Sequence, residues 1–176
     1  MPEPTSDFAV QAWLDALPVE PARAALLRCC GSRRWVSGML AHRPFGSPET
    51  LHDVARTVWA SLEREDFLEA FSHHPPIGGE LAELRARFAS TADWSSQEQA
   101  AVVGASDETL LQLRAANQAY RERFGFLFIV CASGRSAEQL LAALRARLEN
   151  DPALELRVAA EEQAKITALR LGKLKP

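Results

Sequence analysis

The chain has 176 residues, of which 47% are hydrophobic and 24% are charged, and its formal net charge is −3. This is the balance of an ordinary globular protein, so we expect one domain over residues 1–176 with a core of its own. A mildly acidic chain lacks the basic stripe that binds nucleic acid or anionic lipid, so neither is an expected partner.

The three cysteines and the apolar segments bear on the compartment. Cys29, Cys30 and Cys131 form no CxxC pair and are odd in number, which favours a reducing cytoplasm and small buried side chains. The first four residues lack the basic and apolar regions of a secretory signal. The longest apolar run, residues 126–132, is too short to cross a bilayer. We therefore expect a cytoplasmic protein.

Helix signals recur along the chain. Ser6 is a predicted N-cap for a helix that ends before Pro18, and residues 23–30 are helical in composition up to Gly31. Ser47 and Pro48 then read as an N-cap and a first helical residue. The residues that follow recur at helical spacing and form one apolar face: Leu51, Val54, Ala55, Val58, Trp59 and Leu62.

The second half is also predicted to be helical. Residues 80–89 form a short helix, and serines at helix starts precede the next three: Ser95, Ser106 and Ser136. A last helix runs from Pro152 to about Leu171. The strand-like run at residues 126–131 has no partner, so we interpret it as extended or helix-start backbone. The expected fold is an all-α, single-domain bundle of about eight to ten helices with one short extended segment.

The segment from His73 to Gly79 holds two prolines and two glycines directly after a helix. Pro75 disfavours helical backbone at His74, so His74 should stand at a stiff corner where it can face a pocket. Its ordinary pKa suits proton transfer near neutral pH. The alternative is a histidine that merely favours the helix dipole. Zinc-type spacing and an HExxH motif are absent, so a metal site is not expected.

Two further polar positions allow a functional and a structural interpretation. Glu98 can close a capping box with Ser95, or Ser95, Glu98 and Gln99 can present a polar corner to a ligand. On a helical wheel, Arg170 falls on the apolar side of the last helix, the side expected to be buried. The other residues on this side are Val158, Ala159, Ile166 and Leu169, with the polar Glu162 and Gln163 among them. A buried arginine needs an anion, whereas an arginine in the last turn can also extend its head into water.

Taken together, these segments resemble the family of 2-oxo-4-hydroxy-4-carboxy-5-ureidoimidazoline (OHCU) decarboxylases. The ordered motifs cover about 80% of the chain: residues 27–35, Arg43-Pro44-Phe45, His74-Pro75-x-Ile77-Gly78, Ser95-x-x-Glu98-Gln99, residues 117–128 and residues 165–171. Any one motif is weak, but the ordered set is specific. The chain departs from the family pattern at Pro76 and Leu127, and Leu127 alters the stiffness of its segment.

The resemblance implies an all-α enzyme that needs no metal or organic cofactor and forms a homodimer. It implies catalytic roles for His74, Glu98 and Arg170. It implies substrate contacts at these positions: Pro75, Ser95, Gln99, Phe128, Ile129, Val130, Cys131 and Ala132. Trp35, Trp59 and the leucine-rich helices offer the apolar surface that a dimer would bury.

The implied reaction is decarboxylation of OHCU to (S)-allantoin in urate breakdown. The substrate carries its carboxylate beside a C=N bond that can take up the electron pair, so no cofactor is required. Two alternatives stay open: a non-catalytic helical interaction module, which would leave the His-Pro corner and the inward Arg170 without a role, and a hydrolase of a related ureido compound.

Overall fold

The computed structural model describes residues 9–75 and 107–176. Within these ranges the chain forms eight α-helices and no strand, as the sequence predicted. The helices are α1 (Val10–Ala16), α2 (Val19–Cys29), α3 (Arg33–Ala41), α4 (Pro48–Ala60), α5 (Arg64–Ser72), α9 (Asp107–Phe124), α10 (Ala137–Leu148) and α11 (Pro152–Gly172). The helices expected at residues 80–89 and after Ser95 lie outside the described residues.

Local capping fixes several helix starts. The Ser47 hydroxyl accepts the Thr50 N–H at 3.1 Å, and Pro48 opens α4 as predicted. Ser136 and Gln139 form a complete capping box at the start of α10. The prediction for α1 was wrong at its start, because this helix begins at Val10 behind Ala9 and not behind Ser6.

Helix α3 was not predicted from the sequence, and the packing of this helix explains why. Gly38 lies inside this helix, where glycine is unfavourable in isolation. A Cβ at Gly38 would stand 2.5 Å from Val58 Cγ1, so only glycine lets α3 approach α4 this closely. Trp35 on the same helix is fully buried and donates its indole N–H to the Ala55 carbonyl at 3.1 Å. Tertiary contacts therefore stabilise a helix that local propensity does not indicate.

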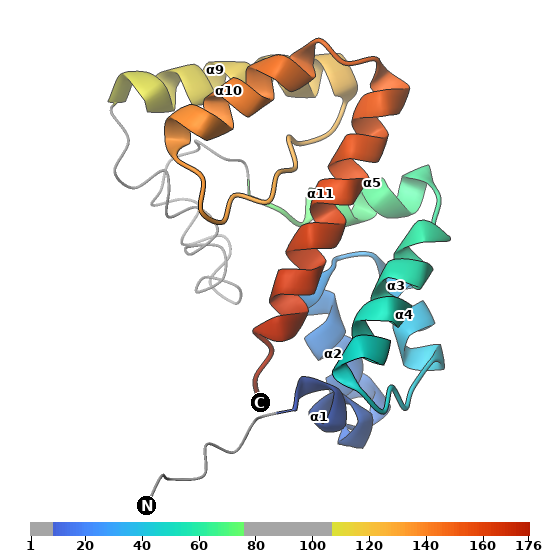
Figure 1. The fold of residues 1–176 in the computed structure, drawn as a ribbon. Helices are drawn as coiled ribbons and strands as arrows, with labels where there is room; N and C mark the ends of the chain where they lie inside the picture. The colour runs from blue at the N-terminus through green and yellow to red at the C-terminus, as the bar shows by residue number, and fades with distance from the viewer. Residues whose placement is uncertain (1–8, 76–106) are drawn as a thin grey trace, which may run out of the picture.

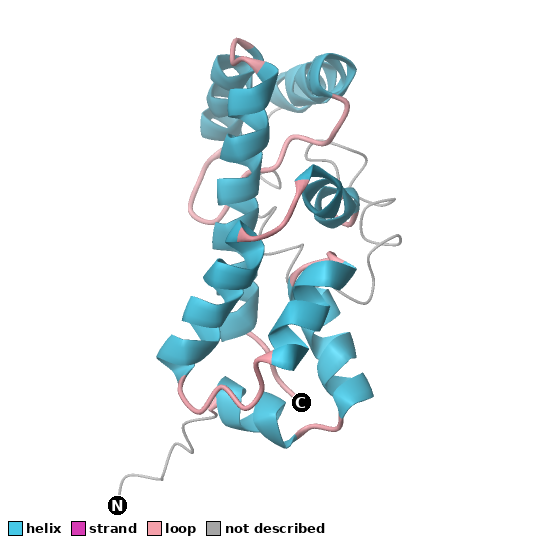
Figure 2. Cartoon of the chain, turned by 90° about the vertical axis from the view of Figure 1, so that its right-hand side faces the viewer, coloured by secondary structure: helices cyan, strands magenta, loops and turns pink. Residues whose placement is uncertain are grey.

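The long helix α11 organises the molecule (Figures 1 and 2). It runs along the length of the fold, with α9 and α10 paired near its first turns and the N-terminal helices beside its later turns. Helices α2, α4 and α5 pack against it. Trp59 of α4 donates its indole N–H to the Ala160 carbonyl at 3.0 Å. Side chains on one helix can therefore reach both groups of helices.

An aromatic cluster joins α5, α9 and the segment that follows α9. Phe71 lies 5.4 Å from Phe126, and Tyr120 lies 5.3 Å from Phe128, measured between ring centroids. Phe124 also packs against Tyr120. Residues 127–132 belong to no helix or strand, in agreement with the predicted extended segment. The cluster places this segment beside the end of α5.

Burial corrects one argument from the sequence. Trp35 and Trp59 are both buried within the chain, so they do not offer surface to a second copy. Among the described residues, the large hydrophobic side chains that are exposed are Val19, Leu27, Leu111, Leu154 and Leu169. Leu169, 39% exposed, was wrongly placed on the buried side of α11, whereas Ile166 and Arg170 are buried there as predicted. None of the described helices combines the length and the apolar character needed to cross a membrane.

Candidate functional site

His74 stands at the corner that the sequence predicted. Helix α5 ends at Ser72, His73 is its C-cap, and the His74 N–H donates to the Phe71 carbonyl at 3.2 Å. Pro75 follows and is half-buried. The corner packs closely on Gly31, where a Cβ would stand 2.5 Å from the ring of His73. The glycine after α2 therefore allows the corner at the end of α5 to approach this closely.

The His74 side chain points to α11. Its Nε2 lies 2.5 Å from Oε1 of Gln163, a fully buried residue 89 positions later. Burial lowers the pKa of His74 to about 3, with the charges of Arg170 and His73 acting in the same direction and the Gln163 hydrogen bond opposing them. The imidazole is therefore neutral near pH 7. A neutral ring gains little from the dipole of α5, so this dipole does not account for the histidine at this position.

Arg170 lies in the last turn of α11 and is 6% exposed. Its charge lowers the pKa of His74, and it also acts on the buried thiols of Cys29 and Cys30. The structure therefore brings together two of the three predicted catalytic residues, one from each side of the α5–α11 contact. A guanidinium beside a neutral imidazole can hold an anionic group while the imidazole accepts a proton.

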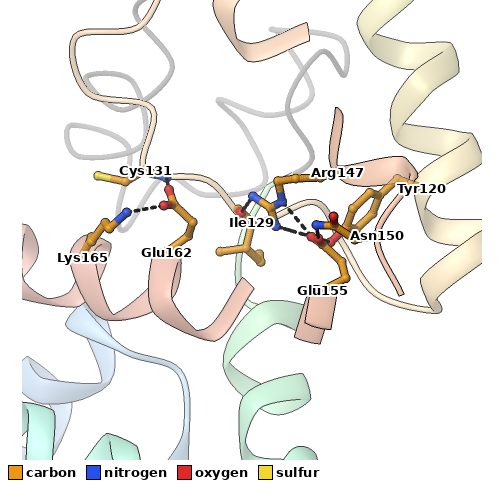
Figure 3. Close-up of polar contacts among 8 residues, drawn as sticks. All are labelled: Tyr120, Ile129, Cys131, Arg147, Asn150, Glu155, Glu162 and Lys165. Carbon is orange, nitrogen blue, oxygen red and sulfur yellow. Dashed lines mark hydrogen bonds and ion pairs between the residues drawn. The ribbon is translucent and has the colours of Figure 1, made fainter. Parts of the chain in front are cut away.

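The predicted substrate-contacting segment, residues 128–132, is fixed by side chains from two helices (Figure 3). Arg147 of α10 donates to the Ile129 carbonyl at 2.7 Å. Glu162 of α11 accepts the Cys131 N–H at 2.7 Å and pairs with Lys165 at 2.5 Å. Within the segment Cys131 is half-buried, whereas Phe128, Ile129, Val130 and Ala132 are buried. These four side chains are therefore less accessible to a bound molecule than the side chain of Cys131.

The charge of Glu162 is maintained by its partners. Burial alone would raise the pKa of this carboxyl. The hydrogen bonds from Lys165 and from the Cys131 N–H, together with the charges of Lys165 and Arg135, outweigh burial and lower the pKa. Glu162 is therefore an ionised acceptor at neutral pH, and charge strengthens its hydrogen bond to the backbone of Cys131.

A buried ionic network supports the same segment from the other side. Glu155 at the start of α11 is fully buried and accepts hydrogen bonds from Arg147, Asn150 and the Tyr120 hydroxyl. Arg147 also lies 4.5 Å from the ring centroid of Phe128. This network, visible in Figure 3, joins α9, α10 and α11. It fixes the guanidinium that binds the Ile129 carbonyl.

Three predicted site residues, Ser95, Glu98 and Gln99, lie outside the described residues. Four residues that the structure places around the site had no role predicted from the sequence: Arg147, Glu155, Gln163 and Thr167. The available signal was the spacing of Gln163, Thr167 and Arg170, polar residues that share one buried face of α11. Within residues 9–75 and 107–176, His, Cys, Asp and Glu side chains do not gather in groups of three or more that could hold a metal ion.

Comparison with known proteins identifies the family. A family model described as OHCU decarboxylase matches residues 15–172. The chain belongs to the OHCU decarboxylase family. It is 32% identical to the 2-oxo-4-hydroxy-4-carboxy-5-ureidoimidazoline decarboxylase of Haloferax volcanii over 130 residues, which are 74% of this chain and 74% of that protein.

A second similar protein is a longer chain. The sequence is 40% identical to the uric acid degradation bifunctional protein TTL of Arabidopsis thaliana over 148 residues. The match covers 83% of this chain but only 45% of the Arabidopsis protein. The similarity therefore concerns one part of that bifunctional protein.

Solved structures of related proteins share the fold. A crystal structure of OHCU decarboxylase in the presence of (S)-allantoin superposes with a TM-score of 0.71 at 38% identity, covering 84% of this chain and 94% of that one. A crystal structure of (S)-allantoin synthase gives a TM-score of 0.67 at 21% identity, covering 93% of this chain and 53% of that one, which supports the fold alone.

Proposed function

We propose that this protein decarboxylates OHCU to (S)-allantoin. Membership of the OHCU decarboxylase family supports the proposal, and the observation that carries it is the pairing of a neutral His74 with the buried Arg170 across the α5–α11 contact. Similar proteins are named for this decarboxylation, and one related crystal structure was obtained with (S)-allantoin. The proposed unit is one domain that spans the chain.

The proposed chemistry uses acid–base steps only. Arg170 binds the substrate carboxylate, and the C–C bond to that carboxylate breaks to release CO2. The electron pair of this bond moves toward the adjacent C=N group, whose nitrogen takes a proton from solvent. His74 accepts the proton of the substrate hydroxyl, which becomes the carbonyl of allantoin. The imidazolium then returns this proton to one face of the ureido-bearing carbon. The net change is uptake of one proton and loss of one CO2.

The remaining predicted residues bind and orient the substrate in this proposal. Glu98 orients His74 or holds the ureido N–H groups. Pro75, Ser95, Gln99 and the backbone of Phe128, Ile129, Val130, Cys131 and Ala132 bind the ring and ureido amides. The hydrogen bonds of Ile129 and Cys131 with Arg147 and Glu162 favour this role, because a binding segment must be rigid before the substrate arrives.

The decisive assay uses OHCU generated freshly from urate and follows circular dichroism together with CO2 release. Spontaneous decay of OHCU gives racemic allantoin, so a dichroic signal distinguishes catalysis from decay. Enzyme-dependent formation of (S)-allantoin is the expected result. A different product would favour a hydrolase of a related ureido compound, and no turnover would favour a non-catalytic helical module; either result would contradict the proposal. Activity should also survive exhaustive treatment with EDTA.

We further propose that the protein acts as a homodimer in the cytoplasm. The dimer follows from the family resemblance, and the cytoplasm from the three free cysteines. Light scattering at working concentration should give twice the chain mass. A monomer mass would contradict the dimer without affecting the proposed reaction.

A further inference from the structure

One face of α11 carries a line of buried polar side chains behind His74. Gln163 is fully buried, and Thr167, one turn later, is 5% exposed. Buried amide and hydroxyl groups need hydrogen-bond partners, and the partners show how each group is oriented. The contacts form a chain that begins at the His74 ring and ends at the Thr167 hydroxyl.

The direction of each hydrogen bond follows from the groups involved. Gln163 Nε2 can only donate, and it lies 3.1 Å from Thr167 Oγ1. The Thr167 hydroxyl therefore accepts this hydrogen bond through a lone pair of its oxygen.

These contacts fix the orientation of the Gln163 amide. With Nε2 committed to Thr167, the carbonyl Oε1 is left to face His74 Nε2 at 2.5 Å. A carbonyl oxygen can only accept, so the histidine nitrogen opposite it carries the proton.

We infer that the pair Thr167–Gln163 is a positioning device that holds His74 as the Nε2–H tautomer, so that Nδ1 is the atom that accepts and returns the substrate proton. Gln163 and Thr167 are positioning residues, since they act through His74. A correctly held tautomer matters because a histidine base with its proton on the wrong nitrogen has no lone pair to offer its substrate. The assignment of Nδ1 as the reacting atom rests on the proposed function, whereas the tautomer does not.

The direct test is the ¹⁵N spectrum of the His74 ring in the folded protein, with resonances assigned by comparison with His74→Asn. A protonated Nε2 and an unprotonated Nδ1 near pH 7 are expected. A protonated Nδ1 would overturn the inference, whatever the activity of the protein. If the tautomer is Nε2–H but OHCU is not turned over, the proposed function fails and the positioning device stands.

Matched variants test whether the chain acts as described. Thr167→Val removes the hydroxyl and keeps the shape, whereas Thr167→Ser restores the hydroxyl. Thr167→Val and Gln163→Leu should give mixed tautomers and lower kcat by about 10-fold to 100-fold, the scale of lost orienting partners, and Thr167→Ser should recover most of it. Unchanged tautomer and kcat in folded Thr167→Val and Gln163→Leu would refute the role of the chain.

A third variant separates positioning from packing. Gln163→Glu keeps an oxygen opposite Nε2 but adds a negative charge that stabilises the imidazolium. The tautomer of the neutral ring should persist, and the pKa of His74 should rise by about 1–3 units. The acidic limb of the pH profile of kcat/KM should move upward by the same amount. A profile that does not move would contradict direct contact between residue 163 and the base.

Discussion

The carboxylate of Glu162 lies 2.7 Å from the backbone nitrogen of Cys131, and this contact joins the long helix α11 to the segment that we expect to bind substrate. Glu162→Ala should leave a partly buried N–H without its acceptor, at a cost of about 1–3 kcal/mol in the free energy of unfolding. We expect KM to rise more than kcat falls, because the segment binds the ring and ureido groups. Denaturant unfolding and steady-state kinetics measure the two effects.

Lys165→Met provides the control for this prediction. It removes the exposed partner of Glu162 but leaves the contact with Cys131, so stability should change by less than about 1 kcal/mol. If Lys165→Met and Glu162→Ala lowered the free energy of unfolding equally, the ion pair would be the stabilising contact, and not the hydrogen bond between Glu162 and the Cys131 backbone.

His74→Asn should fold normally and lose roughly 10²-fold or more in kcat, the usual scale for an acid–base group. The neighbouring exposed His73 supplies a matched control, since His73→Asn removes a ring from the same corner. This control should retain most of the activity. Near-normal turnover by His74→Asn would remove His74 from the proposed mechanism.

Arg170 should act both on the substrate and on His74. Arg170→Lys keeps a positive charge but loses the planar fork that grips a carboxylate, so it should lose most activity while the pKa of His74 stays low. Arg170→Met should lose activity and also raise the pKa of His74, because one cause of its lowering disappears. Kinetics and an NMR titration of His74 measure these outcomes. Full turnover by Arg170→Lys would show that bidentate binding is not needed.

Acid should destabilise the protein through His74. Its pKa is about 3 in the folded chain and 6.5 when unfolded, so between these values the unfolded state binds more protons. The stability due to neutral His74 is complete above pH 6.5 and declines as the pH falls toward 3, by up to about 1.4 kcal/mol per unit. Unfolding free energies from pH 7 to pH 5 should fall more in wild type than in His74→Asn. If the free energy of unfolding depended on pH in the same way in wild type and in His74→Asn, His74 would not be buried and neutral in the folded chain.

The buried network around Glu155 should be costly to break. Arg147→Met would leave the fully buried carboxylate without its cation, and we expect a loss of about 3–5 kcal/mol in the free energy of unfolding. Arg147→Met combined with Glu155→Leu should recover part of this loss, because it removes the stranded charge as well. Chemical denaturation of both variants checks the prediction. No recovery in the double variant would mean that the shape of the network matters more than its charge.

The features that could be predicted from the sequence are helix ends that depend on neighbouring residues. Ser47 and Ser136 cap helices through residues three positions away, and Pro75 ends α5 through its own ring, so each signal lies within one turn. Helix α3 escaped prediction because Gly38 is explained only by Val58 on another helix. Gln163 was predicted to lie on the buried side of α11, but its hydrogen-bond partner His74 is 89 residues away in the sequence. Which residue it contacts depends on how the helices pack, and local sequence signals do not give that.

Helix α11 carries Glu155 in its first turn, Gln163 near its middle and Arg170 in its last turn, and each meets a different part of the chain. One residue inserted between Glu155 and Gln163 would rotate everything downstream by about 100° relative to the start. Glu155 would keep its partners, while Gln163 and Arg170 would turn away from the corner at the end of α5. The number of residues between Glu155 and Gln163 is therefore fixed by the need to point both side chains at their partners. Insertions can be accommodated between helices, but not between Glu155 and Gln163 of α11.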